Sequence, residues 1–326
     1  MRDTKTPISS LGATVSGYRF ERDHLNVTGR LPGISAFMRI RNGEAFLEAT
    51  IRSHISYFDE IVAVHNQCTD RSVEILESLQ AEFGEEKLRV IHYTDRVYPP
   101  GSTGHIETPG DSPNSLVNYY NFSLAATRYQ VATKLDDDHL AIGQATKEVT
   151  DSIRMLGSAF NEMHCFSGPN LLLNENGDLS VPLDDSISGG GDIGFFPVSE
   201  ETYFTHDRRF ERFHRGNLPR KFVGFLYWHL KYLKPDHGFG NYELDQNPNS
   251  RYAKRLKTVE SDRASTLCVA ELQRSVSPSV WRRFKAIVST KDRLQNARDA
   301  AILSSFTDVS ITEAVKASAN WDLVTS

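Results

Sequence analysis

Residues 129–139 read Tyr129-Gln130-Val131-Ala132-Thr133-Lys134-Leu135-Asp136-Asp137-Asp138-His139, a largely apolar run that ends in three adjacent carboxylates. The run predicts a buried strand whose end reaches the surface at the acidic residues. Neighbouring carboxylates there repel one another and lose hydration, unless a divalent cation or a set of hydrogen-bond donors compensates them. Carboxylate oxygens suit Mg²⁺ or Mn²⁺, and Mg²⁺ commonly joins one or two carboxylates to substrate phosphates. The stretch therefore indicates a nucleotide diphosphate site, and an Asp-rich cap on the following helix is the alternative.

The residues before this stretch alternate between strand and helix patterns. Continuous apolar runs predict strands, and apolar residues at helical spacing predict amphipathic helices between them. The predicted strands are residues 34–40, 60–64 and 88–93, and the predicted helices begin near Glu44, at Thr69 or Asp70, and at Asn114. This alternation implies an α/β fold with a Rossmann-like, mostly parallel central sheet flanked by helices. Ligands on such sheets lie beyond the carboxyl ends of the strands, where His65-Asn66, Asp95-Arg96 and Asp136 fall.

The rest of the chain contains a long loop, further strands and a helical end. Residues 94–114 are rich in Pro, Gly, Ser and Thr and predict a functional loop. Further predicted elements are a helix at 147–160, a strand at 162–166 and a hairpin at 171–183 around an Asn-Gly turn. Three glycines at 189–191 predict a close approach of the backbone to a ligand or a sharp bend, and a flexible turn is the alternative. We expect a lead-in at 1–32, a main domain at 33–260 and a C-terminal helical extension at 261–326.

The composition is that of an ordinary globular chain. The 326 residues are 39% hydrophobic and 24% charged, which is typical of soluble domains. The formal net charge of −5 argues against a general nucleic-acid-binding protein, because such proteins need a basic surface. The three cysteines lack the paired spacing of a zinc site or disulfide framework, and no apolar stretch approaches the length of a membrane span. We therefore expect a cytoplasmic protein without a nucleic-acid partner.

Short segments within residues 34–240 carry a resemblance to a known family. Arg39-Ile40-Arg41-Asn42-Gly43-Glu44 is similar to an Arg-x-x-Asn-Glu element after an opening strand, and a later strand leads to the polar turn Thr69-Asp70. Asn121 in a predicted helix, followed by the strand that ends at Asp136-Asp137-Asp138, is similar to the approach to an Asp-x-Asp motif. With these features the chain resembles the family 2 type of GT-A nucleotide-sugar glycosyltransferases, especially bacterial enzymes that build surface polysaccharide or lipopolysaccharide.

The resemblance implies a metal site beside a nucleotide site. Asp138 would bind the Mn²⁺ or Mg²⁺ that bridges the diphosphate, Asp136 would face the ribose or the metal's water shell, and His229 would be a further metal ligand. For His229 the alternative is a core histidine on an apolar helix, and His237 competes for the role. The implied nucleotide-binding residues are Arg39, His65, Asn66, Asp70, Lys134, Asp136, Asp137, Lys231 and Lys234. The implied substrates are a nucleotide sugar, with a UDP-sugar favoured, and a glycan or lipid-linked glycan acceptor.

The chain departs from the family pattern in two places. The family takes its catalytic base from a Glu-Asp pair after the glycines, but residues 207–212 here read Asp207-Arg208-Arg209-Phe210-Glu211-Arg212. Glu211 is the first candidate for the base of an inverting displacement and Asp192 the second, and a solvated surface carboxylate is the alternative for each. The second strand ends in His65-Asn66 rather than in a carboxylate that reads the nucleobase. The family's preference for uridine is therefore in doubt.

Two other functions stay open. A sugar-phosphate nucleotidyltransferase shares the alternating layout, but it needs a Gly-rich phosphate loop after the first strand, where this chain has the single glycine Gly43. A non-catalytic glycan-binding protein on the same fold would explain the broken Glu-Asp pair. The basic stretches 251–257 and 281–285 could rest on the inner face of an anionic membrane, and solvated helix faces are the alternative.

Overall fold

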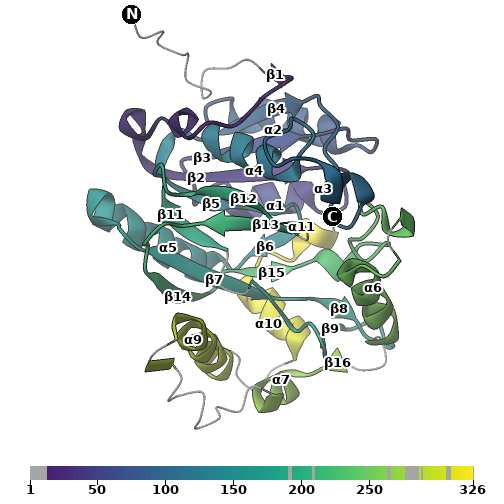
Figure 1. The fold of residues 1–326 in the computed structure, drawn as a ribbon. Coiled ribbons are helices and arrows are strands. Elements are labelled where there is room, and N and C mark those ends of the chain that lie inside the picture. Colours follow the sequence, from purple (N-terminus) through teal and green to yellow (C-terminus); the bar gives the residue numbers. More distant parts are fainter. Residues whose placement is uncertain are drawn as a thin grey trace, which may run out of the picture.

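A nine-stranded sheet lies at the centre of the computed structural model, which describes residues 13–189, 193–207, 210–246, 248–262, 266–275, 286–287, 289–305 and 310–325 (Figure 1). The strands follow the order β1, β4, β3, β2, β5, β11, β7 and β10, and β14 also pairs with β7. Their bounds are β1 Thr14–Val15, β2 Leu31–Ile40, β3 Glu60–His65, β4 Leu88–Tyr93, β5 Tyr129–Lys134, β7 Met163–Pro169, β10 Ile187–Ser188, β11 Gly194–Pro197 and β14 Arg220–Phe225.

The N-terminal half of this sheet is parallel, as the alternation of strands and helices predicts. Neighbouring strands from β1 to β5 run in one direction, and Ala36 of β2 lies opposite Ile61 of β3 and Thr133 of β5. β11 then runs antiparallel to both β5 and β7, whereas β14 runs parallel to β7. The predicted α/β fold with a mostly parallel central sheet is confirmed. The carboxyl ends of β2, β3 and β5 share one edge, which is where such sheets bind ligands.

Side chains that alternate along β2 reach opposite faces of the sheet. The even-numbered residues from Ile34 to Ile40 pack in one buried cluster with α1 (Leu47–His54), α2 (Ser72–Phe83) and α5 (Gly143–Leu156). Phe37 points the other way, into a cluster with α4 (Leu116–Ala125). All residues of α4 are buried, since Phe204 of a neighbouring hairpin belongs to the same cluster. Both faces of the sheet are therefore covered, and the strand ends remain for a ligand.

Smaller strand pairs flank the central sheet. β6 (His139–Ala141) pairs antiparallel with β15 (Tyr227–His229), and β12 (Tyr203–Asp207) pairs antiparallel with β13 (Phe210–His214). β8 (Leu172–Leu173) and β9 (Leu179–Pro182) form the hairpin predicted at 171–183, and β16 (Thr266–Leu267) extends it. Short 3₁₀ helices connect these elements: Arg22–Leu25, Val27–Gly29, Gly157–Ala159, Lys231–Leu233 and Leu244–Gln246.

The helix predicted at 147–160 is shifted. α5 begins at Gly143 and ends at Leu156, because Gly157 follows with a φ of +49°. A residue with positive φ cannot continue a right-handed helix, and glycine adopts this conformation at little cost. The start was missed because the buried face near it consists of small polar residues, Thr146 and Thr150.

Other segments contain more structure than their sequence predicts. The loop at 94–114 includes α3 (Thr103–Glu107), whose first turn is capped by Ser102 Oγ, which accepts a hydrogen bond from His105 N at 3.1 Å. Within the predicted lead-in, β1 joins the sheet edge beside β4 and β2 already begins at Leu31. The boundary expected at residue 260 falls inside α6 (Arg251–Asp262).

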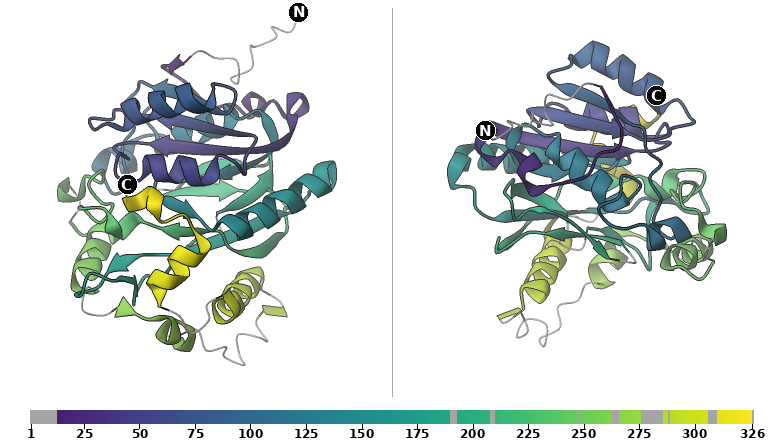
Figure 2. Two further views of the ribbon diagram at one scale, coloured as in Figure 1. Left: turned by 180° about the vertical axis from the view of Figure 1, so that it is seen from behind. Right: turned by 45° about the horizontal axis from the view of Figure 1, so that its top comes forward.

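The C-terminal helices share a core with the strands that carry the site. Their bounds are α6 Arg251–Asp262, α7 Val269–Ser275, α9 Thr290–Ser305, α10 Ile311–Ser318 and α11 Asp322–Thr325. Ile311 and Val315 of α10 lie in one buried cluster with Leu140 and Trp228, and Trp228 Nε1 donates a hydrogen bond to Ser318 Oγ at 2.9 Å. In the left view of Figure 2, α10 and α11 (yellow) run from the lower part of the molecule to α1. Helix α10 therefore packs directly against β6 and β15, and the expected division into domains stays a prediction.

Candidate active site

The acidic cluster is held beside β15 by backbone pairing. β5 ends at Lys134, and Leu135 N still donates to Phe37 O at 3.0 Å. The chain then turns through the acidic residues into β6, where His139 lies opposite His229 in the antiparallel register. Leu230 N donates to Asp138 O at 2.7 Å and continues this pairing. Residues about ninety positions apart in sequence thus come together, as the resemblance implies for Asp138 and His229.

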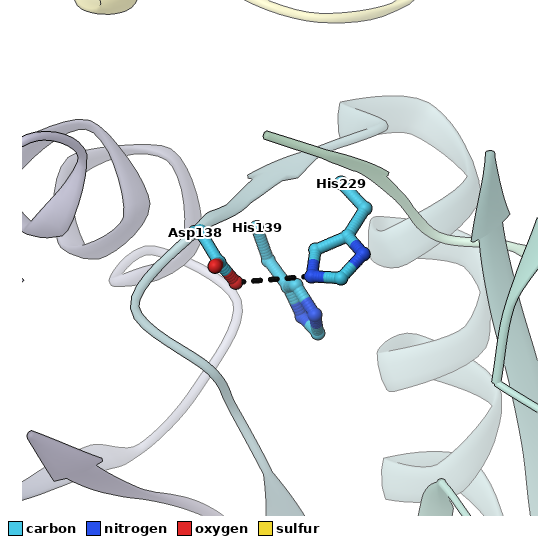
Figure 3. A group of neighbouring side chains, drawn as sticks. All are labelled: Asp138, His139 and His229. Atoms are coloured by element: carbon cyan, nitrogen blue, oxygen red, sulfur yellow. Dashed lines mark hydrogen bonds and ion pairs between the residues drawn. The ribbon is translucent and has the colours of Figure 1, made fainter. Parts of the chain in front are cut away.

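Asp138, His139 and His229 place a carboxylate oxygen and two imidazole nitrogens within 4.8 Å of one another (Figure 3). The Nε2 atom of His229 lies 3.1 Å from Asp138 Oδ1. The Nε2 atom of His139 is buried and has no hydrogen-bond partner among the described residues, although it lies 4.0 Å from Asp136 Oδ2. A buried nitrogen without a partner is costly, and imidazole and carboxylate groups together suit a divalent transition-metal ion. The residues present therefore fit a divalent metal ion.

Asn170 sets the orientation of the His229 ring. Its Nδ2 donates to Asp185 O at 2.5 Å, so its Oδ1 must face His229 Nδ1, which lies 2.5 Å away. The Nδ1 atom of His229 then carries a proton, and Nε2 is the nitrogen that faces Asp138. A second hydrogen bond of this kind is typical of metal-binding histidines, because it fixes the tautomer and the ring plane. His229 lies on strand β15 and not on a helix as the alternative had it, and its role as a metal ligand stays a prediction.

Cations surround the three acidic side chains. Asp136 lies 2.9 Å from Lys134 Nζ and 3.6 Å from Arg39 Nη2. Lys234 Nζ lies 3.0 Å from Asp138 Oδ2 and 3.4 Å from Asp137 Oδ1. The cluster does not cap α5, whose N-cap residue is Ile142 and makes no side-chain cap hydrogen bond. The alternative of an Asp-rich helix cap is therefore wrong.

The environment shifts the pKa values of the acidic residues in opposite directions. Burial disfavours ionised Asp138, but Lys234 and His229 outweigh burial and hold its pKa well below the ordinary value. Asp136 is half-buried, which raises the pKa of its carboxyl, but Lys134, His139 and Arg39 outweigh this effect and hold the pKa below the ordinary range. Burial raises the pKa of Asp137 to about 6 despite the nearby Lys234. Asp136 and Asp138 therefore stay ionised down to a lower pH than Asp137 does.

A cavity of about 380 Å³ lies at the carboxyl ends of β2, β3 and β5. It brings together most of the residues implied by the family resemblance. Those that line it are Arg39, Asn66, Lys134, Asp136, Asp137, Asp138, Glu211, His229, Lys231 and Lys234. Tyr119, Tyr120, Tyr242 and Tyr252 add aromatic walls. Its size and its mixture of aromatic surface with a few charged groups are typical of a small-molecule site.

Lys231 and Lys234 occupy different surroundings in this cavity. Lys231 Nζ lies 4.1 Å from the centre of the Phe239 ring and 5.4 Å from that of Tyr242, and burial lowers its pKa to about 8. No carboxylate oxygen of the described residues lies within ion-pair distance of Lys231, in contrast to Lys234. A partly desolvated ammonium group held on aromatic faces is suited to receive a phosphate as a point charge.

Glu211 of β13 also lines this cavity. Tyr120 donates its hydroxyl to Glu211 Oε1 at 2.6 Å, and Glu211 Oε2 is buried without a hydrogen-bond partner among the described residues. The guanidinium of Arg39 stacks on the Tyr120 ring, with Cζ 3.2 Å from the ring centre. One carboxylate oxygen is thus held while the other is left for a ligand. The alternative of a solvated surface carboxylate does not describe Glu211.

Other predicted residues lie elsewhere or are already engaged. His65 is absent from the cavity lining; it stacks on His92 with ring centres 4.6 Å apart, and burial lowers its pKa to about 4. Asp70 braces two loops by accepting hydrogen bonds from Glu44 N at 2.9 Å and Ser72 N at 3.0 Å. Asn66 lines the cavity, but its side chain holds the backbone of Tyr93, Asp95 and Val97. The roles of these three residues in binding a nucleotide stay predictions.

Several predicted residues lie outside the described part of the chain. These are Asp192 with Gly190 and Gly191, Arg208 and Arg209 of the broken pair, and Trp281, Arg282, Arg283 and Lys285 of the basic stretch. Of the other basic stretch, Arg255 forms an ion pair with Asp185, and Lys254 and Lys257 are exposed. No helix among the described residues is long and apolar enough to cross a membrane. Membrane contact stays a prediction.

The loop after β2 does not cradle phosphate. The amide of Gly43 donates to Ser72 Oγ at 2.8 Å, and the amide of Glu44 donates to Asp70 Oδ2 at 2.9 Å. A phosphate loop needs such amides to point at the ligand. The nucleotidyltransferase alternative thus lacks its binding loop in the structure as well as in the sequence.

Sequence reasoning missed three residues of the site. His139 follows the acidic cluster directly, so a histidine next to candidate metal ligands was an available signal. Tyr120 and Asn170 carried none, because their contacts with Glu211 and His229 join elements far apart in the chain. Asn121, one residue beyond Tyr120, braces the backbone of Phe204 and so has a structural role.

No protein-family model matches the chain, and no curated protein matches it in sequence. Among solved structures, glucosyl-3-phosphoglycerate synthase from Mycobacterium tuberculosis with Mn²⁺, UDP and glucosyl-3-phosphoglycerate aligns with 38% of this chain and 41% of its own, at 18% identity and a TM-score of 0.24. The same synthase with Mg²⁺ and UDP aligns at 19% identity and a TM-score of 0.23, over 39% of this chain and 41% of its own. A mycobacterial protein aligns at 13% identity and a TM-score of 0.27, over 46% of this chain and 44% of its own. Each alignment spans less than half of either chain, and the function proposed below rests on the side chains of the cavity.

Proposed function

We propose that this protein is a metal-dependent GT-A glycosyltransferase of the family 2 type, which moves a sugar from a nucleotide-sugar donor to a hydroxyl group. One observation carries the proposal. A single cavity at the carboxyl ends of β2, β3 and β5 is lined by Asp138 and His229, which share a candidate donor set with His139, and by the Glu211 carboxylate. A divalent-ion site beside Lys231 and Lys234, in one cavity with a carboxylate whose second oxygen has no hydrogen-bond partner among the described residues, suits displacement of a diphosphate by a hydroxyl.

The residues around the metal site would hold the donor. Asp138, His139 and His229 would bind the ion, and Asp136 would orient its water shell or the ribose. A divalent ion bound there would offset the negative charge that develops on the departing diphosphate. Lys231 and Lys234 would contact the phosphates as point charges, and the Arg39 guanidinium on Tyr120 would close the cavity beside Asp136.

Glu211 would act as the base. The acceptor oxygen forms a bond to C1 of the sugar while the bond from C1 to the diphosphate oxygen breaks and its electron pair leaves with the diphosphate. The hydroxyl proton passes to Glu211 Oε2, the oxygen that Tyr120 does not engage. Since attack and departure are on opposite sides of C1, the product has inverted configuration. Asp192 stays the second candidate for the base.

The proposed substrates are those that the family resemblance implies. The donor would be a UDP-sugar and the acceptor a glycan or lipid-linked glycan in surface polysaccharide or lipopolysaccharide synthesis, at the inner face of the membrane. The placement of His65 outside the cavity lining leaves the nucleobase without its expected side-chain reader. Several bases therefore have to be compared experimentally.

The first test is thermal unfolding of the full chain with UDP, GDP, ADP and CDP, each with and without Mn²⁺. A ligand at 100 times its Kd that binds only the folded protein adds about 2.7 kcal/mol of stability. We expect at least one diphosphate to stabilise the protein only when Mn²⁺ is present, and this stabilisation to disappear in Asp138→Asn, which keeps the shape of the side chain.

Asp151→Asn is the matched control, because Asp151 lies on the surface of α5 and pairs only with Lys147 and Arg154 in the described structure. It should retain the full Mn²⁺-dependent shift. If no diphosphate stabilises the protein, or if Asp138→Asn responds like the wild type, the proposed function is wrong. Stabilisation without hydrolysis or transfer of any nucleotide sugar would instead favour the non-catalytic alternative.

A further inference from the structure

The ammonium group of Lys234 lies where a metal ion bound to Asp138 Oδ2 would have to lie. Its Nζ lies 3.0 Å from Asp138 Oδ2, while the other oxygen, Oδ1, faces His229 Nε2 at 3.1 Å. The Lys234 side chain is only 12% exposed, so these contacts are formed away from bulk water. Both oxygens of the Asp138 carboxylate are thus in contact with protein groups.

A divalent ion bound to Asp138 Oδ2 and the observed Lys234 contact exclude one another. Mg²⁺ binds a carboxylate oxygen at about 2.0–2.1 Å, and similar ions bind at similar distances. An ammonium group 3.0 Å from the same Asp138 oxygen would then lie against the ion and its ligands. The two cations also repel each other strongly in a buried site. An ion that uses Asp138 Oδ2 must therefore move Lys234.

Asp137 keeps Lys234 in the cavity when it moves. Lys234 Nζ also contacts Asp137 Oδ1 at 3.4 Å, and Asp137 is itself confined because a Cβ on Gly43 would lie 2.2 Å from Asp137 Oδ2. The Lys234 backbone is fixed by hydrogen bonds to Lys231 O at 3.2 Å and from His237 N at 2.9 Å. Only the flexible four-carbon stem is left to swing, so the ammonium group stays within reach of a diphosphate on the metal.

We propose that Lys234 is an exchangeable counter-ion, which neutralises Asp137 and Asp138 when no divalent ion is bound and transfers to the donor's diphosphate when the ion displaces it. The proposal rests on the proposed function and specifies how metal and nucleotide binding are coupled. The ion alone has to break the Lys234 contact, whereas the ion with a diphosphate offers Lys234 a new anionic partner. Each ligand therefore strengthens the binding of the other.

The experiment measures Mn²⁺ affinity from the EPR signal of free Mn²⁺, first without nucleotide and then with saturating UDP or GDP. In the wild type we expect the nucleotide to tighten Mn²⁺ binding. In Lys234→Met, Mn²⁺ alone should bind at least about tenfold more tightly than to the wild type, within the usual range of coupling between ligands. The additional tightening by nucleotide should shrink in this variant, because it lacks the ammonium group that would move from Asp138 to the diphosphate.

Lys231→Met is the matched control. Lys231 lines the same cavity but contacts aromatic rings instead of the acidic cluster, so its loss should weaken nucleotide binding without tightening the binding of Mn²⁺ alone. Lys234→Gln, which keeps a hydrogen-bond donor, serves if Lys234→Met does not fold. The wild-type coupling can be measured without any variant.

The outcomes separate this proposal from the proposed function. Equal or weaker Mn²⁺ binding in both Lys234 variants would overturn the exchange while leaving a metal-dependent transferase intact. Independent binding of Mn²⁺ and nucleotide to the wild type would also overturn it. If neither the wild type nor any variant bound Mn²⁺, the metal site itself, and with it the proposed function, would be wrong.

Discussion

Replacing Asn170 by alanine tests whether the residues behind the metal ligands determine metal affinity. Asn170 is 2% exposed and makes two side-chain hydrogen bonds, one to His229 Nδ1 and one to Asp185 O. Each lost bond costs about 1 kcal/mol, and up to about 3 kcal/mol if its partner stays buried without another. We therefore expect the free energy of unfolding to fall by roughly 2–6 kcal/mol. Since His229 also loses its fixed tautomer, Mn²⁺ affinity should fall by about 10- to 100-fold.

Asn121→Ala is the control for the loss of stability. Asn121 is also 2% exposed, and its side chain likewise makes two hydrogen bonds, to the backbone N and O of Phe204. It lies on α4 and contacts no candidate metal ligand in the described structure. Its replacement should destabilise the protein by a similar amount and leave Mn²⁺ affinity unchanged.

Urea unfolding gives the stability of the three proteins, and calorimetric titration with Mn²⁺ gives the affinities. The two measurements separate a positioning role from simple packing. If Asn170→Ala and Asn121→Ala lost the same stability and both bound Mn²⁺ like the wild type, the assignment of His229 Nε2 as a metal ligand oriented by Asn170 would be refuted.

The remaining predictions concern the base and the dependence of stability on pH. Glu211→Gln keeps an oxygen for the Tyr120 hydroxyl but cannot take a proton. Sugar transfer should therefore fall by about 10²- to 10⁴-fold, while Mn²⁺-dependent nucleotide binding changes little. An unchanged rate would show that another carboxylate is the base. Burial lowers the pKa of His54 from 6.5 to about 4. Between these two pH values the unfolded chain binds a proton at His54 that the folded protein does not bind. The free energy of unfolding therefore falls as the pH falls. His54→Phe should reduce the stability lost between pH 6.5 and 4 by about 3 kcal/mol relative to the wild type, as measured by urea unfolding at each pH; parallel curves would contradict the neutral, buried His54.

The parallel part of the fold could be predicted because its signals are local. The stretch Glu60 to Val64 is a nearly continuous apolar run, because both faces of β3 are covered. In β2 every second residue, from Ile34 to Ile40, lies on the face that packs against α1 and α5. The same logic located the acidic cluster at a strand end. The reversal of β11 and the packing of α10 beneath β15 depend on pairings between distant segments, which no local period records.

Part of the candidate site could be predicted, because charged residue types and the family resemblance indicate individual residues. Asp138, His229, Lys231, Lys234 and Glu211 line the cavity, as their types and positions implied. A residue that only positions another functional side chain could not be identified from the sequence. Asn170 is an example, because it contacts His229 only through the pairing of distant segments. Conversely, Asp70 and Asn66 look like ligands in the sequence because polar residues at strand ends also serve to brace loops.

The packing of α10 against Trp228 also constrains how the protein matures during synthesis. Trp228, next to His229 on β15, is 1% exposed, and it donates to Ser318, 90 residues further along the chain. At a translation speed of about 5–20 residues per second, roughly 5–20 s pass between the synthesis of β15 and that of its α10 partner. During this interval the indole lacks the cover it has in the finished molecule. The strand that presents His229 therefore reaches its final packing only after α10 has been synthesised.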